Sequence, residues 1–249
     1  MDYERAKEVF EKYVENYDQK EEMISLKKEH SLEVANLMAE LAFRLNLSKE
    51  EIILAKIIGL LHDIGRFEQF RIYGRLSDRK TVDHADQSCI YLFEEGHIRD
   101  FIEEDKYDQI IELAIRYHNK LDVPPLKDKE KLFVSMIRDM DKVDIFKQYA
   151  IHYHYVFKAD EVTPNVLKNF KERHLLDIKD NQSKSDAVLS ILAFIYDFNF
   201  EESLDILVET DNFDLFVSTI EVAEDSEKLW LKVREICYDA INEGIHHES

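Results

Sequence analysis

Turn-forming residues are scarce in this chain, and that scarcity constrains the fold more than any motif does. The 249 residues include only five glycines and three prolines. Sheets and sandwiches need such residues at short intervals, so the composition predicts long helices joined by short connections. Because 45% of the residues are hydrophobic, these helices can bury a sizeable core. We therefore predict an all-α protein.

At 249 residues the chain could be one large domain or a domain with an appendage, and no internal repeat, low-complexity tract or long linker separates residues 150–249. We predict a single all-helical unit over residues 1–249. Its core is expected at about residues 25–150, with additional helices from about residues 151–249 packed on that core. Within the core, Ser48-Lys49-Glu50-Glu51 is typical of a capping box that opens a helix.

The charge excludes one large class of partner. The formal net charge of −20 argues against a surface that binds duplex nucleic acid, since phosphate backbones are bound through clustered lysine and arginine. No apolar run approaches the length of about 18 residues that a membrane span needs, and the N-terminus has no signal-peptide character. Cys89 and Cys237 lie far apart and form no zinc-binding spacing, so we expect both to stay reduced in the cytoplasm.

His62 and Asp63 form an unusual pair at the end of an apolar helix, which Gly65 is expected to stop. Imidazole and carboxylate groups are costly to bury unless they are hydrogen-bonded or bind a metal. The alternative is a solvated helix C-terminus. His62 continues the apolar helix face formed by Leu54, Ile57, Ile58 and Leu61.

Four other polar residues occupy comparable positions. His30, His118 and Asp141 lie on apolar helix faces that should point inward, and His84 opens a helix that runs to Phe93. One such histidine is usually a core residue with a satisfied hydrogen bond, but a whole set would need many separate buried partners. A shared metal site explains them together. Five further histidines lack this context and are interpreted as structural or exposed: His152, His154, His174, His246 and His247.

The order of these residues resembles the HD superfamily of metal-dependent phosphohydrolases, whose ligands run H, HD, D. The resemblance covers about residues 25–150. The last ligand of the family precedes a basic and a hydrophobic residue, as Asp141 precedes Lys142 and Val143 here. Asp139 and Asp144 remain candidates for supporting groups.

The resemblance implies one or two divalent ions. The first would be bound by His30, His62, Asp63 and Asp141. The extra histidines resemble those of family members that hold two metals, so His84 and His118 would bind the second ion, with Asp63 bridging both. A set of imidazoles and carboxylates without cysteine suits Mn, Fe, Co, Ni or Zn, and Mg is a further candidate.

Residues 65–82 are expected to form a positively charged loop beside these ligands. Arginine recognises phosphate oxygens in a planar, bidentate way, so Arg66 and Lys80, the nearest in sequence, are our predicted phosphate contacts. The alternative is that these cations pair with carboxylates of the protein. Asp83 is a predicted N-cap of the helix that His84 opens. Arg66, Arg71, Arg75, Arg79 and Lys80 face only Glu68 and Asp78 in this loop.

The predicted function is hydrolysis of a small phosphate ester, with a nucleotide as one candidate, by a metal-activated water. Asp63, Arg66 and Lys80 would be its catalytic residues. Two alternatives stay open: a di-iron oxygenase on a similar scaffold, and a metal-stabilised regulatory or binding protein without turnover. A small phosphorylated substrate is the expected partner, without duplex nucleic acid or membrane. The sequence leaves the oligomeric state open.

Overall fold

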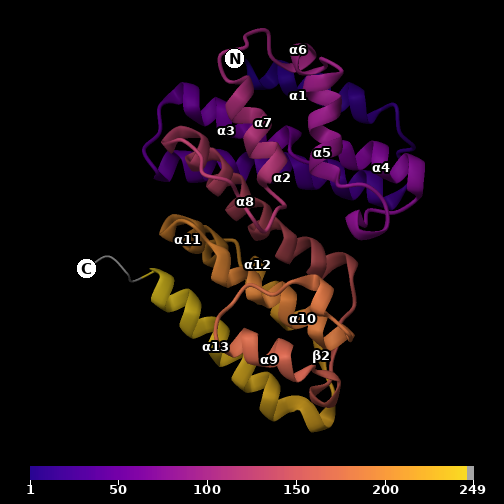
Figure 1. Ribbon diagram of the computed structural model, residues 1–249, viewed down its shortest axis with the longest axis vertical. Helices are drawn as coiled ribbons and strands as arrows, with labels where there is room; N and C mark the ends of the chain where they lie inside the picture. The colour runs from indigo at the N-terminus through magenta and orange to yellow at the C-terminus, as the bar shows by residue number, and fades with distance from the viewer. Residues whose placement is uncertain (246–249) are drawn as a thin grey trace. The chain divides into compact units, whose positions relative to one another are not determined.

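The computed structural model describes residues 1–245, and within them the prediction of an all-α protein is confirmed (Figure 1). The chain forms two compact units, the first spanning Met1–Asp141 and the second beginning at Lys142. The boundary falls inside one long helix, α8 (Asp128–His152). Each unit is described by itself below, and the single-unit organisation expected from the sequence stays a prediction.

Unit 1 is a set of helices arranged around the pair α2 and α3, which lie side by side (Figure 1). The capping box predicted at the start of α3 is confirmed, because Ser48 Oγ accepts from the Glu51 N–H and the Glu51 carboxylate accepts from the Ser48 N–H. Besides the first part of α8, its elements are α1 (Tyr3–Val14), α2 (Glu22–Arg44), α3 (Lys49–Leu61), α4 (Gly65–Tyr73), η1 (Asp78–Lys80), α5 (His84–Cys89), η2 (Ile90–Glu94), α6 (Ile98–Phe101) and α7 (Asp108–Tyr117).

The prediction of a loop over residues 65–82 is wrong for its first half, because Gly65 begins helix α4 instead of only ending the preceding one. Tertiary contacts stabilise this helix. Phe67 is fully buried and its ring packs against Phe10 and Tyr13. Gly65 allows α4 to approach α5, since an added Cβ would lie 2.6 Å from Ser88 N, and the Gly65 N–H donates to Ser88 Oγ at 2.9 Å.

The contact between α2 and α3 depends on Gly59. A Cβ added there would lie 2.8 Å from Ala35 Cα and 2.9 Å from Val34 O, both backbone atoms of α2. Alanine raises helix propensity by about 1 kcal/mol over glycine, yet we expect Gly59→Ala to lower the free energy of unfolding by about 1–3 kcal/mol because α2 and α3 must separate. Chemical denaturation measures the change.

The matched control for this variant is Gly244→Ala in α13 (Glu227–Ile245). Its added methyl would meet only the flexible side chain of Leu204. We expect a smaller loss of stability there than at Gly59, because a side chain can rotate away whereas a helix backbone cannot. A Gly59→Ala protein as stable as wild type would contradict the close approach of the two helices.

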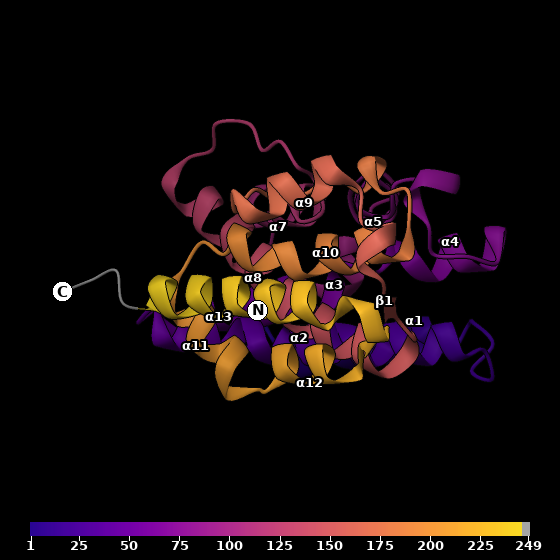
Figure 2. The ribbon, with the colours of Figure 1, turned by 90° about the horizontal axis from the view of Figure 1, so that it is seen from below.

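Unit 2 is also helical, apart from two short parallel strands that pair Val156 with Glu221 and Phe157 with Val222. Its helices α11 and α13 pack together (Figure 2). Besides the remainder of α8, its elements are β1 (Val156–Phe157), η3 (Ala159–Glu161), α9 (Pro164–Lys171), η4 (Ile178–Asp180), α10 (Lys184–Leu192), η5 (Ala193–Asp197), α11 (Glu201–Glu209), α12 (Asn212–Thr219), β2 (Glu221–Val222), η6 (Glu224–Ser226) and α13 (Glu227–Ile245).

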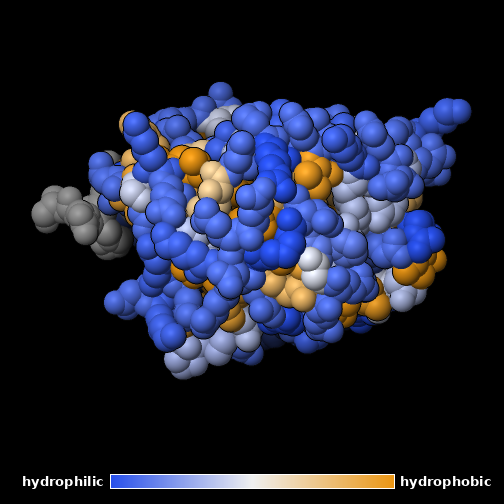
Figure 3. Space-filling view, turned by 90° about the horizontal axis from the view of Figure 1, so that it is seen from above, coloured by the Kyte–Doolittle hydropathy of each residue, from blue (hydrophilic) through white to orange (hydrophobic). Residues whose placement is uncertain are grey.

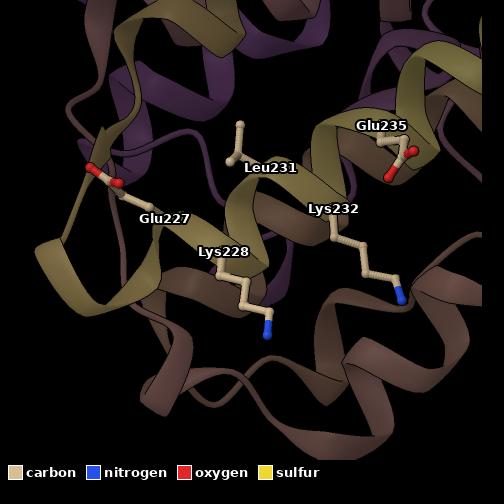
Figure 4. Close-up of a pocket in the computed structure, with 5 residues that line it drawn as sticks. All are labelled: Glu227, Lys228, Leu231, Lys232 and Glu235. Carbon is tan, nitrogen blue, oxygen red and sulfur yellow. The ribbon is translucent and has the colours of Figure 1, made fainter.

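The surface of the described residues is mostly hydrophilic on the face shown in Figure 3, where hydrophobic residues are scattered. None of the helices in residues 1–245 combines the length and the hydrophobicity of a membrane span. Cys89 and Cys237 are buried thiols without a disulfide in the described chain. A pocket of about 710 Å³ lies on α13 (Figure 4), lined by Glu227, Lys228, Leu231, Lys232 and Glu235.

Candidate metal centre

Unit 1 brings together all six residues that the sequence suggested as metal ligands. Helix ends supply four of them, because His62 and Asp63 follow α3, His118 follows α7 and His84 is the first residue of α5. Histidine and aspartate on inward helix faces supply the rest. All are buried except the partly exposed Asp141. The six are His30 in α2, His62, Asp63, His84, His118 and Asp141 in α8.

The first group surrounds the Nε2 atoms of His30 and His62, which lie 3.2 Å apart. Asp141 Oδ1 is 3.1 Å from His30 Nε2 and 3.6 Å from His62 Nε2. Asp63 Oδ2 lies 3.6 Å from His30 Nε2 and 3.8 Å from His62 Nε2. Two imidazoles and two carboxylates thus share one small volume.

The second group lies on the other side of Asp63. Its Oδ1 atom is 3.1 Å from His84 Nε2 and 3.7 Å from His118 Nε2. The two ring nitrogens are 2.9 Å from each other. Asp63 therefore contacts both groups through different oxygens, as a bridging carboxylate would.

The hydrogen bonds at Nδ1 of His62, His84 and His118 determine which nitrogen of each ring faces the centre. His62 Nδ1 lies 2.7 Å from Gly59 O, and His118 Nδ1 lies 2.6 Å from Ile115 O. His84 Nδ1 faces a carboxylate oxygen at 2.5 Å. Carbonyl and carboxylate oxygens only accept, so each Nδ1 carries a hydrogen, and the Nε2 atom of each ring points to the centre.

This donor set fits divalent ions. Imidazole Nε2 atoms and carboxylate oxygens are the ligand types of divalent transition metals, and buried groups of this kind need polar or ionic partners. Asp63 Oδ1 has no hydrogen-bond donor in the described structure. Three overlapping triads have ligand atoms within 4.8 Å of one another: His30, His62 and Asp63; His62, His118 and Asp141; and Asp63, His84 and His118.

The electrostatics keep Asp63 and His118 in the forms that bind metal. Burial alone would raise the pKa of the Asp63 carboxyl, but the Lys27 ammonium and the nearby His62 and His84 hold it well below its usual range. Burial, followed by the neighbouring His84 and His62, lowers the pKa of His118 to about 3. Asp63 is therefore ionised and His118 neutral near neutral pH.

The low pKa of His118 predicts a pH-dependent stability for the metal-free protein. An unfolded histidine has a pKa of about 6.5, so between about pH 6.5 and about pH 3 the unfolded chain binds one more proton at this position than the folded chain. The free energy of unfolding therefore falls as the pH is lowered through this window. We expect His118→Asn to flatten the slope of melting temperature against pH, and an unchanged slope would contradict the assignment.

Lys27 is a functional candidate that sequence reasoning missed. Its Nζ atom lies 2.7 Å from Asp63 Oδ2, and its side chain is mostly buried. The signal was present, because Lys27 precedes His30 by three residues and so shares its helix face. Next to Lys28 it resembles an ordinary solvated lysine, and only the approach of Asp63 reveals its place.

The two predicted phosphate contacts differ in environment. Arg66 Nη1 donates to Gln69 Oε1, Leu76 O and Asp78 Oδ1, and Arg66 Nε lies 3.7 Å from Asp63 Oδ1. Lys80 is exposed in η1, and its side chain makes no hydrogen bond or ion pair within residues 1–245. Their contact with a phosphate stays a prediction.

Several other sequence interpretations can be compared with the structure. Asp83 is confirmed as an N-cap, since it accepts from the Ala85 and Asp86 N–H groups. Arg71 pairs with Glu68, as the alternative of local ion pairs expected. Among the described residues, Asp139 and Asp144 belong to none of the candidate metal groups. The same holds for His152, His154 and His174. His246 and His247 lie outside the described residues.

Comparison with known proteins identifies the family but no individual relative. Neither the curated proteins nor the solved structures contain a match to this chain. A family model described as HD domain matches residues 28–154, slightly more than half of the chain. That segment contains His30, the His62–Asp63 pair and Asp141 in the family's order. The resemblance predicted from the sequence is thereby confirmed. The chain belongs to the HD domain superfamily of metal-dependent hydrolases.

Proposed function

We propose that this protein is a metal-dependent phosphohydrolase that acts on a small phosphate ester, with a nucleotide as one candidate substrate. One observation carries the proposal: buried imidazole Nε2 atoms and carboxylate oxygens converge around Asp63, whose Oδ1 atom has no donor among the described residues. Such a donor set fits divalent cations, and the HD family is one of metal-dependent hydrolases.

The six residues divide between two proposed ions. His30, His62, Asp63 and Asp141 would hold the first, and His84 and His118 would hold the second with Asp63 shared between them. Bound divalent cations lower the pKa of a coordinated water and polarise a phosphoryl oxygen. The ligand types suit Mn, Fe, Co, Ni, Zn or Mg.

The surrounding residues would tune charge and bind the substrate. Lys27 Nζ, 2.7 Å from Asp63 Oδ2, offsets part of the negative charge of the two aspartates. Arg66 and Lys80 are the proposed phosphate contacts, because guanidinium and ammonium groups supply donors to phosphate oxygens. In Arg66 the Nη1 atom is already used by protein acceptors, so Nη2 is the atom proposed to face the phosphate.

An activity screen tests this proposal. Wild-type protein reconstituted with Mn²⁺, Co²⁺, Ni²⁺, Zn²⁺, Fe²⁺ or Mg²⁺ is incubated with phosphate monoesters, phosphodiesters and nucleotides. We expect phosphate or alcohol release that EDTA abolishes and that the Asp63→Asn variant lacks. Fully metal-loaded protein that hydrolyses no ester would overturn the proposal. Oxygen consumption by the Fe²⁺ form would favour the di-iron oxygenase instead.

Lys80 offers the cleanest test of phosphate binding. Because its side chain is exposed and makes no bond within residues 1–245, Lys80→Ala should leave folding and metal content unchanged. We expect it to lower kcat/KM by one to two decades, about 1.4–2.7 kcal/mol at about 1.36 kcal/mol per decade. Arg79→Ala is the matched control, since Arg79 is an exposed cation in the same turn, and equal kinetics in the two variants would remove Lys80 from the site.

A further inference from the structure

The turn η1 places a carboxylate against His84 on the side opposite the metal centre. Asp78 Oδ2 lies 2.5 Å from His84 Nδ1. On the other side of the same ring, Nε2 lies 3.1 Å from Asp63 Oδ1 and 2.9 Å from His118 Nε2. The His84 ring therefore connects Asp78 to the proposed second ion through its two nitrogens.

Asp78 is itself held in place by side chains of α4. Its Oδ1 atom accepts from Arg66 Nη1 at 2.7 Å and from Gln69 Nε2 at 3.0 Å. Arg66 Nη1 also donates to Leu76 O at 2.9 Å, and the buried Gln69 donates to Thr81 Oγ1 at 2.8 Å. These bonds fasten the segment that carries Asp78 to α4, so the position of the carboxylate is fixed.

His84 needs such a partner because of where it lies in its helix. His62 and His118 follow helices, and each donates Nδ1–H to a carbonyl three residues earlier, Gly59 O and Ile115 O. His84 is the first residue of α5, so no preceding helical turn offers it a carbonyl. A side chain from the neighbouring turn supplies the acceptor instead.

We propose that Asp78 is a positioning residue, which fixes the orientation and tautomer of His84 for the second ion, and that Arg66 acts through Asp78. The inference rests on the proposed metal centre. It goes beyond that centre because it makes binding of the second ion depend on η1, a turn that contributes no ligand. A carboxylate that accepts from a ligating histidine also raises the basicity of the ring.

A third ion is the competing explanation, because Asp78, Asp83 and His84 also offer ligand atoms within 4.8 Å of one another. The hydrogen bonds argue against it. Asp78 Oδ1 already accepts from a guanidinium and an amide, and Oδ2 faces the Nδ1–H of His84. Asp83 pairs with Lys120 and caps α5. Donors thus occupy the space that a third cation would need.

Metal titration of Asp78→Asn tests the inference. Asparagine has one acceptor oxygen, so either His84 or Arg66 loses its acceptor and faces an NH₂ group. Mn²⁺ binding is followed by electron paramagnetic resonance, and Co²⁺ binding by its visible absorption. We expect one ion to bind with wild-type affinity and the other about 10- to 100-fold more weakly. Arg66→Met should weaken binding of the same ion.

The matched control is Asp83→Asn, which removes the same charge close to His84. Asparagine is also a good N-cap, so this variant should keep both ions at wild-type affinity. Melting temperatures of all variants, measured without metal, show whether a loss of binding reflects unfolding. Retained wild-type affinity for both ions in Asp78→Asn would overturn the inference, as would an equal loss in Asp83→Asn.

The number of metal ions that the wild-type protein binds provides the remaining outcomes of the test. A wild type that binds fewer than two ions removes the ion that Asp78 would serve and overturns the inference. Three ions would assign Asp78 and Asp83 as ligands and overturn it as well. Two ions with the selective loss in Asp78→Asn but no hydrolysis of any ester would support the positioning role and reject the phosphohydrolase, so the two proposals fail separately.

Discussion

Replacing Asp63 with Asn is expected to remove most bound metal and to reduce phosphate-ester hydrolysis to background. Both of its carboxylate oxygens are committed to the centre. Oδ1 lies 3.1 Å from His84 Nε2, whereas Oδ2 lies 3.6 Å from His30 Nε2. Asparagine keeps the shape but loses the charge that both proposed ions would share. Metal content by elemental analysis and rates with a phosphate ester measure the two effects.

The control for this variant is His97→Ala, because His97 belongs to none of the candidate metal groups in the described structure, where it contacts Asp100 and Tyr91. It should keep wild-type metal content and activity. Asp63→Asn also leaves the Lys27 ammonium without its carboxylate, so the melting temperature of the metal-free variant must be measured to separate unfolding from loss of ligands. A folded Asp63→Asn protein with full metal occupancy would contradict the assignment.

Replacing His84 and His118 together with Ala is expected to leave a single bound ion. The remaining ligands, His30, His62, Asp63 and Asp141, form a group of their own around the close contact of His30 Nε2 with His62 Nε2. We expect kcat/KM to fall by about 10²-fold or more, about 2.7 kcal/mol at about 1.36 kcal/mol per decade. The reason is that two ions clamp the attacking and leaving oxygens from both sides, and the variant would lose one side of this clamp.

A double replacement of exposed histidines provides the matched comparison. His154 and His174 are 71% and 63% exposed in their side chains and belong to no candidate metal group within residues 1–245. Their double alanine variant should bind as many ions as wild type. If the His84/His118 variant also binds two ions, the second site lies elsewhere.

Much of the fold was predictable, because it follows from local rules. Scarce glycine and proline predicted helices, and the capping residues Ser48 and Asp83 predicted where two of them begin. The convergence of the six candidate ligands was also predictable in outline. Polar groups on inward helix faces must find partners in the same interior, and shared ions satisfy several of them at once.

The features that escaped prediction depend on tertiary contacts. Residues 65–73 begin with a glycine and carry several charged side chains, and they are helical because Phe67 packs against α1 and Gly65 fits against α5. Lys27 gains its role only from the approach of Asp63. Positive charge in this segment indicated phosphate contacts, whereas the structure shows that Arg66 also holds Asp78, a partner that sequence distance alone does not reveal.

The substrate could not be predicted, because the metal-binding residues determine the type of reaction and not the group that is attached to the phosphate. Six imidazoles and carboxylates suit many phosphate esters equally. Specificity would come from groups that contact the rest of the substrate, and no motif in the sequence marks them. The activity screen must therefore span several classes of ester.

Anomalous diffraction from crystals soaked in Mn²⁺ would test the central claim most directly. The account predicts two peaks, one bound by His30, His62 and Asp141 and the other by His84 and His118, with Asp63 contacting both. Absence of any peak among these residues at saturating Mn²⁺, or peaks bound only by other residues, would contradict it.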